Sequence, residues 1–546
     1  MPDDKAQQIK TLWERELTKQ TNARNLWQDT ADHIYPYAQI TSFYTAGEPR
    51  TTFIYDMTPM LDMLDMVSGL KHVLIPTGQP FFSIKASDSR FAKRDSQRYM
   101  AYATEIAHEK ILQSNFVTEF DEVLRSLIVF GPGDIFSQWT KKEGLSYRAS
   151  EIGTYILIED SYKNVIGSIH KLSLTAESAY KQFGDKAGDK VKESALDERK
   201  KYDIFEFLHN VTLRQGRNPK LSDDYNLNMP YESCYVNLKE VKLVEEGGYL
   251  ENPYHTARWM RPTHEKDGRG IATEILPQIK VLYQQMKDFI ECGNKWNNSP
   301  YLTNDNYIEG EVNLSPGGRT HVTEDGAVQA IPPGVIGNFP ITEKSLEYVT
   351  NIIHRAFFKN AFSPLEDLTG SNRMTELEVR ERIRSVLPKI GPPVGRVWVE
   401  LLDKLLTRSI LLLIRNGEIE RPPVELAGQN FGIEYVGPFA LALRSSQAKG
   451  FQEWVTFVGA MSSVFPDAPD NVDSDDAIIR MGQTFGVNVE DMATVDERDA
   501  KRKKRAQDEQ QIKMAQAMQV ASEAYGKTTK SPEQGSPAKQ LMGEGT

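Results

Sequence analysis

The residues of this chain that could do chemistry do not stand at the spacings that enzymes use. Gly131-Pro132-Gly133 and Gly268-Arg269-Gly270 lack the further glycine of a dinucleotide-binding loop, and no G-x-x-x-x-G-K-[ST] phosphate loop occurs. His108-Glu109 and His264-Glu265 have no second histidine four residues after the first, so no zinc-protease motif forms. Ser168-Ile169-His170-Lys171 matches S-x-x-K, but in a predicted strand without companion motifs. We therefore expect no catalytic residues.

The cysteines give no metal or disulfide framework. Cys234 and Cys292 are the only two in 546 residues, and their separation fits no metal-ligand spacing. We expect free thiols, no metal and no cofactor, and a protein that is not an enzyme. An enzyme of unrecognised type stays open as an alternative, which a nuclease or ATPase assay on the purified protein would detect.

The composition is that of a folded, acidic protein. Apolar residues make up 39% and charged residues 26%, and the formal net charge is −11. An acidic whole argues against a protein that coats nucleic acid through a basic face, but it leaves open a channel that lets DNA slide, where strong phosphate contacts would be a hindrance. The N-terminus lacks the apolar core of a signal peptide, and no apolar run approaches the ~18 residues of a membrane span. We expect a soluble protein of a reducing compartment or a virion, with no membrane partner.

Two amphipathic helices are predicted at 271–291 and 343–360. Apolar residues recur there at spacings of three and four, the rhythm of helices that pack lengthwise against neighbours. The expected packing residues are Ile275, Ile279, Leu282, Met286 and Phe289 in the first helix, and Leu346, Val349, Ile353 and Phe357 in the second. The segment between them, 292–342, is rich in proline and glycine and cannot form a long helix. The pattern predicts a two-helix stalk with a turn-rich tip, a shape suited to assembly or to a channel.

Helices and strands alternate in blocks along the rest of the chain. Helices are predicted at 5–34, 56–75, 93–130 with a break at 114–116, and 172–184, and strands at Tyr155–Ile158, Val165–Lys171, Phe205–Leu213 and Tyr235–Leu243, with turns at 160–164 and 245–248. Beyond the stalk we expect a helical region at 373–415 that Pro388 and Gly391-Pro392-Pro393 kink or break, a strand at 432–436, helices at about 440–465, 474–486 and 489–520, and a disordered tail.

Two groups of charged residues each allow two interpretations of their role. Arg373, Arg380, Arg382, Arg384 and Arg396 stand among glutamates, which fits either a solvated helix face or contacts to other subunits or DNA. The basic run 501–505 fits a solvated helix face or a collar that faces nucleic acid.

A collinear set of short landmarks resembles the head-to-tail connector (portal) proteins of short-tailed phages over roughly 10–505. The landmarks are Ile34-Tyr35-Pro36, Asp56-Met57-Thr58-Pro59, Gly69-Leu70, Leu74-Ile75-Pro76, Ser114-Asn115-Phe116, Phe130-Gly131, Glu159-Asp160, Gly247-Gly248-Tyr249, Arg258-Trp259, Arg373-Met374-Thr375, Glu378-Val379, Gly391-Pro392 to Arg396, Glu400-Leu401-Leu402, Gly437-Pro438 and Val487. Met57 stands where the family often has serine, and Pro392-Pro393 doubles a proline.

The resemblance implies an α+β, mainly α, portal fold with wing, stem, clip and crown regions that assembles as a ring. The regions expected are a wing at 1–270, stem helices at 271–291 and 343–360, a clip at 292–342, a channel loop at 361–372, the rest of the wing at 373–439, a crown at 440–520 and a disordered tail at 521–546. The expected channel residues are Lys359, Pro364, Glu366, Asp367 and Arg373, and the expected residues of the clip that face a packaging motor are Asp305, Glu309, Glu311 and Arg319.

The resemblance also implies a function and a set of partners. The expected assembly is a homododecamer at one capsid vertex of the virion, built in the host cytoplasm, through which double-stranded viral DNA is packaged and ejected without sequence reading. Expected partners are the large terminase, tail adaptor and tail tube proteins, and scaffolding and major capsid proteins. A tail or scaffolding protein with a coiled hairpin is the structural alternative, and electron microscopy would separate the two.

Overall fold

The computed structural model places a mixture of helices and strands in two units, Met1–Ala440 and Leu441–Thr546. It describes residues 2–42, 45, 47–48, 50, 54–76, 80–86, 94–222, 225–298, 301–304, 313, 315–316, 318–322, 329–330, 339–359, 389–423, 431–436, 451, 453–461, 465 and 495–526.

The predicted N-terminal helices are confirmed. They are α1 (Pro2–Lys19), α2 (Thr21–Ile34), α3 (Thr58–Leu74), α4 (Arg94–Gln113) and α5 (Phe116–Val129). At the start of α3 the carboxylate of Asp56 accepts the backbone N–H of Thr58 at 2.8 Å, and Pro59 lies in the first turn. Between α4 and α5 the side-chain amide of Asn115 both donates to and accepts from the backbone of Tyr147. The break at 114–116 therefore holds the strand that contains Tyr147 through two hydrogen bonds.

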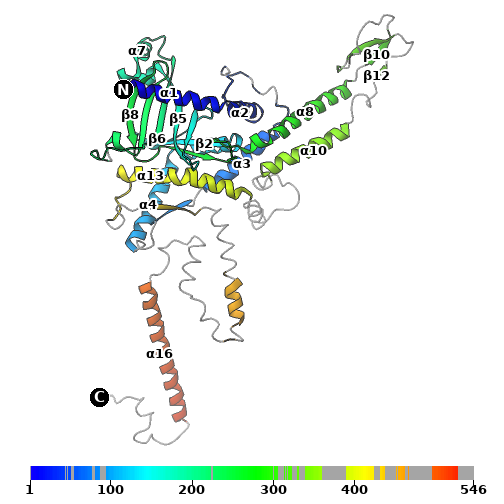
Figure 1. The fold of residues 1–546 in the computed structure, drawn as a ribbon. Coiled ribbons are helices and arrows are strands. Elements are labelled where there is room, and N and C mark those ends of the chain that lie inside the picture. Colours follow the sequence, from blue (N-terminus) through cyan, green and yellow to red (C-terminus); the bar gives the residue numbers. More distant parts are fainter. Residues whose placement is uncertain are drawn as a thin grey trace. The chain divides into compact units, whose positions relative to one another are not determined.

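A five-stranded antiparallel sheet in the order β4-β5-β6-β7-β8 forms the largest layer (Figure 1). Its strands are β4 (Tyr155–Glu159), β5 (Val165–Thr175), β6 (Ile204–Leu213), β7 (Tyr231–Asn237) and β8 (Lys242–Tyr249). Ala6, Ile9 and Trp13 of α1 cover one face. The other face is covered by α6 (Ala176–Phe183), the 3₁₀ turn η2 (Gly184–Ala187) and α7 (Asp189–Leu196).

The last hairpin of this sheet, between β7 and β8, differs from the prediction, which is wrong there. The predicted strand Tyr235–Leu243 contains the turn, which the side chain of Asn237 closes by accepting the backbone N–H groups of Lys239 and Glu240. The predicted turn at 245–248 lies inside β8. Gly248 is required there because a Cβ atom would come within 2.2 Å of the backbone oxygen of Asn226, in the short 3₁₀ turn η3 (Asn226–Asn228), so this glycine serves a close approach and not a turn.

A second sheet, in the order β3-β2-β9, was not predicted from the sequence. It consists of β2 (Pro132–Thr140), β3 (Gly144–Ala149) and β9 (Tyr254–Arg258). The first six residues of β2 are buried, and so is the whole of β9. With both faces covered these strands lack the alternation of polar and apolar residues by which strands are recognised.

The helices α8 (Ile271–Asn297) and α10 (Phe339–Ala356) lie side by side as a helical hairpin (Figure 1). This confirms the two predicted helices, although α8 continues six residues beyond the predicted end and α10 lies four residues earlier at both ends. Three short strands stand between the helices in the sequence: β10 (Tyr301–Asn304), β11 (Arg319–Val322) and β12 (Gln329–Ala330), where β10 pairs with β11 in parallel and with β12 antiparallel.

The chain after the hairpin returns to the body of the first unit. Residues 389–397 are helical, so the chain is not broken at Gly391-Pro392-Pro393; Pro388, the other predicted kink or break, lies outside the described residues. The irregularity comes later, as a π-helical turn, η5 (Trp398–Leu402), followed by α13 (Asp403–Arg415). Gly417, with φ of +80°, stops the helix as predicted. The predicted strand at 432–436 is β13 (Phe431–Tyr435), which pairs antiparallel with β1 (Phe82–Ala86).

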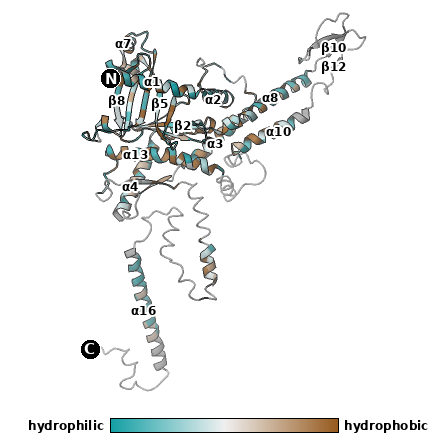
Figure 2. Cartoon of the chain, viewed as in Figure 1, coloured by the Kyte–Doolittle hydropathy of each residue, from teal (hydrophilic) through white to brown (hydrophobic). Residues whose placement is uncertain are grey.

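Helices are the elements described in the second unit. Residues 453–461 are helical, and α16 runs Val495–Gly526, so the tail predicted to be disordered from 521 begins with helix. The coloured part of α16 in Figure 2 consists mostly of hydrophilic residues, and residues 499–518 are exposed on every side of the helix. The predicted helix at 474–486 and the tail after 526 lie outside the described residues. Across the described parts of both units, no helix is long and apolar enough to cross a membrane.

Candidate functional site at the base of the helical hairpin

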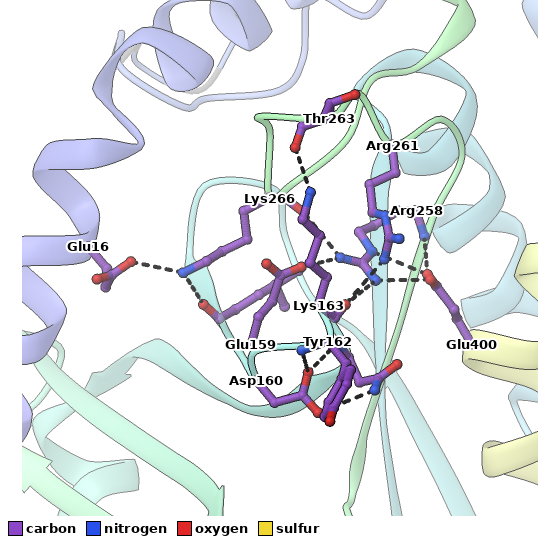
Figure 3. Close-up of polar contacts among 12 residues, drawn as sticks. Glu16, Glu159, Asp160, Tyr162, Lys163, Arg258, Arg261, Thr263, Lys266 and Glu400 are labelled. Atoms are coloured by element: carbon purple, nitrogen blue, oxygen red, sulfur yellow. Dashed lines mark hydrogen bonds and ion pairs between the residues drawn. The ribbon is translucent and has the colours of Figure 1, made fainter.

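Arg258, the last residue of β9, is the centre of an ion cluster close to the start of α8 (Figure 3). Its side chain is 2% exposed and forms ion pairs with Glu159 at the end of β4 and with Glu400 in η5, the latter at 2.9 Å. Burial acts to lower the pKa of Arg258, but the hydrogen bonds and charges of Glu400 and Glu159 outweigh it and raise that pKa. One guanidinium thus joins both sheets to the helical segment after the hairpin.

The turn between β4 and β5 docks on the same cluster. Asp160 accepts two backbone N–H groups of this turn at 2.8 Å, as the predicted turn requires. Lys163 has a φ of +63°, and its carbonyl oxygen accepts hydrogen bonds from Arg258 and Arg261 at 3.4 and 3.2 Å. Its ammonium donates to the carbonyl oxygen of Thr263 at 2.6 Å, which ties the turn to the loop that leads into α8.

Lys266 extends the cluster to α1. Its ammonium donates to the carboxylate of Glu16 at 2.9 Å and to the carbonyl oxygen of Leu157 at 3.0 Å. Burial acts to raise the pKa of Glu16, but hydrogen bonds from Lys19 and Lys266 outweigh it and lower that pKa to about 2. Four separate segments therefore meet at the loop before the hairpin, and they fix the direction in which α8 leaves the body.

Gly131 explains why a glycine-proline-glycine run stands at the end of α5. Its φ is +115°, and a Cβ atom there would lie 2.6 Å from the backbone of Arg269. The carbonyl oxygen of Gly131 also accepts the N–H of Trp259 at 2.8 Å. The glycine-proline-glycine run therefore allows the loop before α8 to pack closely against the end of α5. This role agrees with the absence of a phosphate-loop pattern around it.

Asp62 on α3 holds the other helix of the hairpin. This aspartate is fully buried, and its carboxylate contacts His354 Nδ1 at 2.5 Å and Lys359 Nζ at 3.3 Å. On the α8 side, the hydroxyl of Tyr283 donates to the carbonyl oxygen of His33 in α2 at 2.6 Å. Polar contacts therefore fix both helices to the body, one on each side of the hairpin.

Replacing Asp62 by alanine should loosen the base of α10. We expect a loss of about 1–3 kcal/mol in local stability, because His354 and Lys359 lose a buried partner but can be hydrated in part. Hydrogen exchange of the amides at 350–356 should speed up accordingly. Asp29→Ala is the matched control: it removes the exposed Lys280–Asp29 pair on the opposite side of the hairpin and should cost less than ~1 kcal/mol. Equal exchange in the Asp62→Ala variant and the parent would contradict the role assigned to Asp62.

Most of the predicted packing residues of the hairpin are buried within one subunit. Ile279, Leu282, Ile353 and Phe357 are fully buried, and Leu346 and Val349 nearly so. Ile275, Met286 and Phe289 are partly exposed, whereas Leu276 and Tyr283, which the heptad pattern omits, are buried. The buried stripe of α8 is broader than a heptad seam because the base of the helix contacts α2 and α5 as well as α10.

Other predicted site residues fall largely outside the described residues. This holds for Pro364, Glu366, Asp367 and Arg373 of the channel loop and for Asp305, Glu309 and Glu311 of the clip. Lys359 is described and is paired with Asp62, and Arg319 begins β11. Of the five arginines predicted to form a charged group at 373–396, the structure describes Arg396. Its side chain donates a hydrogen bond to the carbonyl oxygen of Trp259 at 3.0 Å.

Two clusters resemble chemical sites but are structural. Glu232, Cys234 and Glu246 lie close enough to hold a metal ion, but the ammonium of Lys5 forms ion pairs with both carboxylates. Burial raises the pKa of Cys234 to about 12, so this cysteine is a thiol at neutral pH. Ser168 is buried, whereas Lys171, at an odd spacing along β5, pairs with Glu206 at 3.0 Å. The S-x-x-K match is therefore split between the two faces of a strand.

A buried histidine cluster lies where β9 contacts the large sheet. It comprises His170 on β5, His209 on β6 and His255 on β9, each 1–2% exposed. His209 contacts the hydroxyls of Tyr254 and Ser233 at 2.7 and 3.0 Å, and the rings of His170 and Tyr254 stack at 3.6 Å. Burial lowers the pKa of all three histidines, that of His209 to about 3. They are neutral hydrogen-bonding groups at physiological pH.

A family model described as bacteriophage head to tail connecting protein matches residues 6–492, from α1 across the hairpin into the second unit. This chain belongs to that family. The portal protein of Salmonella phage epsilon15 is 24% identical over 522 residues, which cover 93% of this chain and 91% of that protein. The probable portal protein of Bordetella phage BPP-1 is 20% identical over 522 residues, 94% of each chain. The resemblance noted from the landmarks is thereby confirmed.

The structure gives several landmarks of this connector protein a physical role. Arg258 and Glu400 are partners in one ion pair, Trp259 is buried beside them, and Gly131 makes room for the loop before α8. Residues that identify the family in the sequence thus gather at the base of the hairpin.

Proposed function

We propose that this connector protein forms a ring, commonly of twelve copies, at one vertex of the phage head, and that DNA is packaged and ejected through its axis. Membership of the connector family over 6–492 carries the proposal. A paired hairpin such as α8 and α10, fixed to the body at its base, suits a ring because it offers long lateral edges to neighbouring copies. The ring would act as a conduit and platform and not as an enzyme.

The regions of the proposed ring follow from the chain order. The wing is the body of the first unit, the stem is 271–291 and 343–360, which the helical hairpin largely contains, the clip is 292–342 and the crown is 440–520. The acidic clip residues Asp305, Glu309 and Glu311, with Arg319, would dock the large terminase during packaging and the tail adaptor and tail tube proteins afterwards. Scaffolding and major capsid proteins would contact the outside of the ring during assembly in the host cytoplasm.

The proposed channel loop is 361–372. Pro364, Glu366 and Asp367 would lie toward the bore, where repeated carboxylates repel phosphate and keep DNA from binding tightly. Lys359 and Arg373 flank the loop. Because Lys359 already neutralises Asp62, Arg373 is the stronger candidate for a positive ring around the DNA backbone. Such a channel would contact double-stranded DNA without reading its sequence.

Electron microscopy of the purified full-length chain tests the proposed function. We expect closed rings with an axial hole, and mass measurement in solution should give about twelve copies. Monomers, open filaments or two-fold dimers at the concentrations used for assembly would contradict the proposal, since a heterologous contact that closes must give a ring.

A further inference from the structure

The buried stripes of the hairpin are already used inside one subunit, so contacts between copies must come from other positions. Among the exposed positions of the two helices, two stripes stand out, beside which Lys280 of α8 and Glu343 and Glu347 of α10 are exposed as well. On α8, Glu274, Pro277, Val281, Gln284, Asp288 and Glu291 recur at spacings of three and four and are all exposed. On α10, Lys344, Tyr348, Asn351 and Arg355 do the same. We call these the acidic stripe and the basic stripe.

The two stripes are complementary in charge and in apolar content. The acidic stripe carries three carboxylates and no cation, and the basic stripe carries a lysine and an arginine and no anion. Each also exposes a large apolar side chain, Val281 at 42% and Tyr348 at 69%. Glu274 lies 3.5 Å from Arg269, and Asp288 accepts a hydrogen bond from Gln284, but both carboxylates stay exposed to solvent. Charge that is exposed on one chain is therefore available to a neighbour.

The register of the hairpin brings matching residues to the same height. Gln285 of α8 and Ser345 of α10 are joined by a hydrogen bond of 2.9 Å, and the helices run in opposite directions. Counting from this contact, Lys344 is level with Met286, Tyr348 with Leu282 and Arg355 with Ile275. Copies in a ring are related by rotation, and a rotation about an axis parallel to the hairpin does not shift a residue along that axis. The α10 helix of a neighbouring copy therefore lies beside α8 in the same register.

We propose that the acidic stripe of one subunit packs against the basic stripe of the next, with Lys344 beside Asp288, Tyr348 over Val281 and Arg355 beside Glu274. Each pair lies within two residues of equal height, which is ~3 Å along a helix. This rests on the ring of the proposed function and names its lateral contact. The partner is a second copy of this chain, and the contact is heterologous because the two stripes differ.

Charge reversal tests the pairing. Lys344→Glu and Asp288→Lys should each raise the protein concentration needed for rings about tenfold at low salt, because each places like charges opposite one another. The double variant Lys344→Glu/Asp288→Lys should recover most of the loss. Glu347→Lys is the matched control, since Glu347 is an exposed residue of α10 outside the basic stripe, and it should assemble like the parent. Light scattering after size-exclusion chromatography measures the fraction in rings, and circular dichroism checks that each variant folds.

Cysteine cross-linking tests the direction of the contact. Val281→Cys and Tyr348→Cys together, in a Cys292→Ser background, should give a ladder of covalent oligomers beyond the dimer after mild oxidation, and either cysteine alone should not. A bond within one chain would leave the mass unchanged.

The outcomes separate the two proposals. Recovery in the double variant, with a ladder beyond the dimer, supports the pairing. The pairing is overturned if every reversal variant assembles into rings as well as the parent does, or if the double-cysteine variant gives no ladder or only dimers. In either case the proposed ring itself still stands. Failure of the parent chain to form rings removes the proposed function itself.

Discussion

Replacing Arg258 by methionine should lower the free energy of unfolding of the first unit by about 3–5 kcal/mol. The side chain is 2% exposed and shared by Glu159 and Glu400, which are themselves mostly shielded from water. Removing the cation leaves two largely buried carboxylates without the guanidinium that pairs with both, which costs more than the ion pairs contribute when intact. Urea unfolding of the full-length chain, followed by tryptophan fluorescence, would report the shift, since Trp259 is buried beside the cluster.

Two companion variants identify the cause of this loss. Arg258→Met combined with Glu400→Gln and Glu159→Gln should recover part of the stability, because the unpaired charges are removed with the arginine. Arg261→Met is the matched control: Arg261 is exposed and donates to the carbonyl oxygen of Lys163, so its loss should cost less than ~1 kcal/mol. If Arg258→Met and Arg261→Met unfold at the same urea concentration, the cluster does not fix the base of the hairpin.

Mild acid should destabilise the first unit steeply, through the buried histidine cluster. His170, His209 and His255 have pKa values lowered by burial, so each binds a proton in the unfolded chain that it does not bind in the folded chain. Their contribution to stability is complete above a pH of about 6.5 and is lost as the pH falls toward the folded values. Each histidine contributes about 1.4 kcal/mol per pH unit in that range, so three contribute about 4 kcal/mol per pH unit.

Asp134 opposes this trend in part. Burial raises its pKa to about 6, against hydrogen bonds from Ser150 and Thr256 that act to lower it. The folded chain therefore takes up a proton at Asp134 before the unfolded chain does, which offsets about 1.4 kcal/mol per pH unit between pH 6 and about 4. Arg148 adds a positive charge that further disfavours protonation of His170 and His209. The three histidines and Asp134 together should therefore lose about 3 kcal/mol per pH unit below pH 6.

Urea unfolding at intervals between pH 7.5 and 4.5 measures this slope. His209→Gln keeps hydrogen-bonding groups but cannot titrate, so it should flatten the slope by about 1.4 kcal/mol per pH unit even if it lowers stability at pH 7.5. His264→Asn, which replaces an exposed histidine outside the cluster, is the matched control. A parent whose stability is constant across this range would show that the three histidines are not held neutral by the fold.

Local patterns were enough to predict most of the helices, although α7 was missed and the helix predicted at 172–184 begins four residues later, as α6, after the end of β5. Asp56 and Pro59 mark the start of α3, Gly417 marks the end of α13, and the stripe through Ile279 and Leu282 marks α8, because each signal acts within a few residues. Prediction failed where a distant segment decides the local structure. Gly248 looks like a turn residue until the backbone of Asn226 is seen to approach it.

The candidate site was less predictable than the fold, because its partners are far apart in the chain. Arg258 pairs with Glu400 across 142 residues, and neither residue has a local pattern that names the other. The sequence indicated them as landmarks of a family, and their pairing needed the structure. The exposed stripes of α8 and α10 were missed because the helices were predicted from their apolar residues. Those residues are the ones that pack inside a single chain.

The pairing of β1 with β13 bears on how the chain folds as it is made. Phe82 to Ala86 pair with Phe431 to Tyr435, so the first strand must wait for about 345 further residues to leave the ribosome. At ~5–20 residues per second this wait is roughly 20–70 s. During that time β1 has no partner strand. An unpaired strand edge can pair with the edge of another chain, and the nearest other chains are those being made on the same messenger RNA. Completion of the body is thus delayed until the hairpin has been synthesised, and any chaperone that protects β1 in the interval would raise the yield of assembly-competent protein.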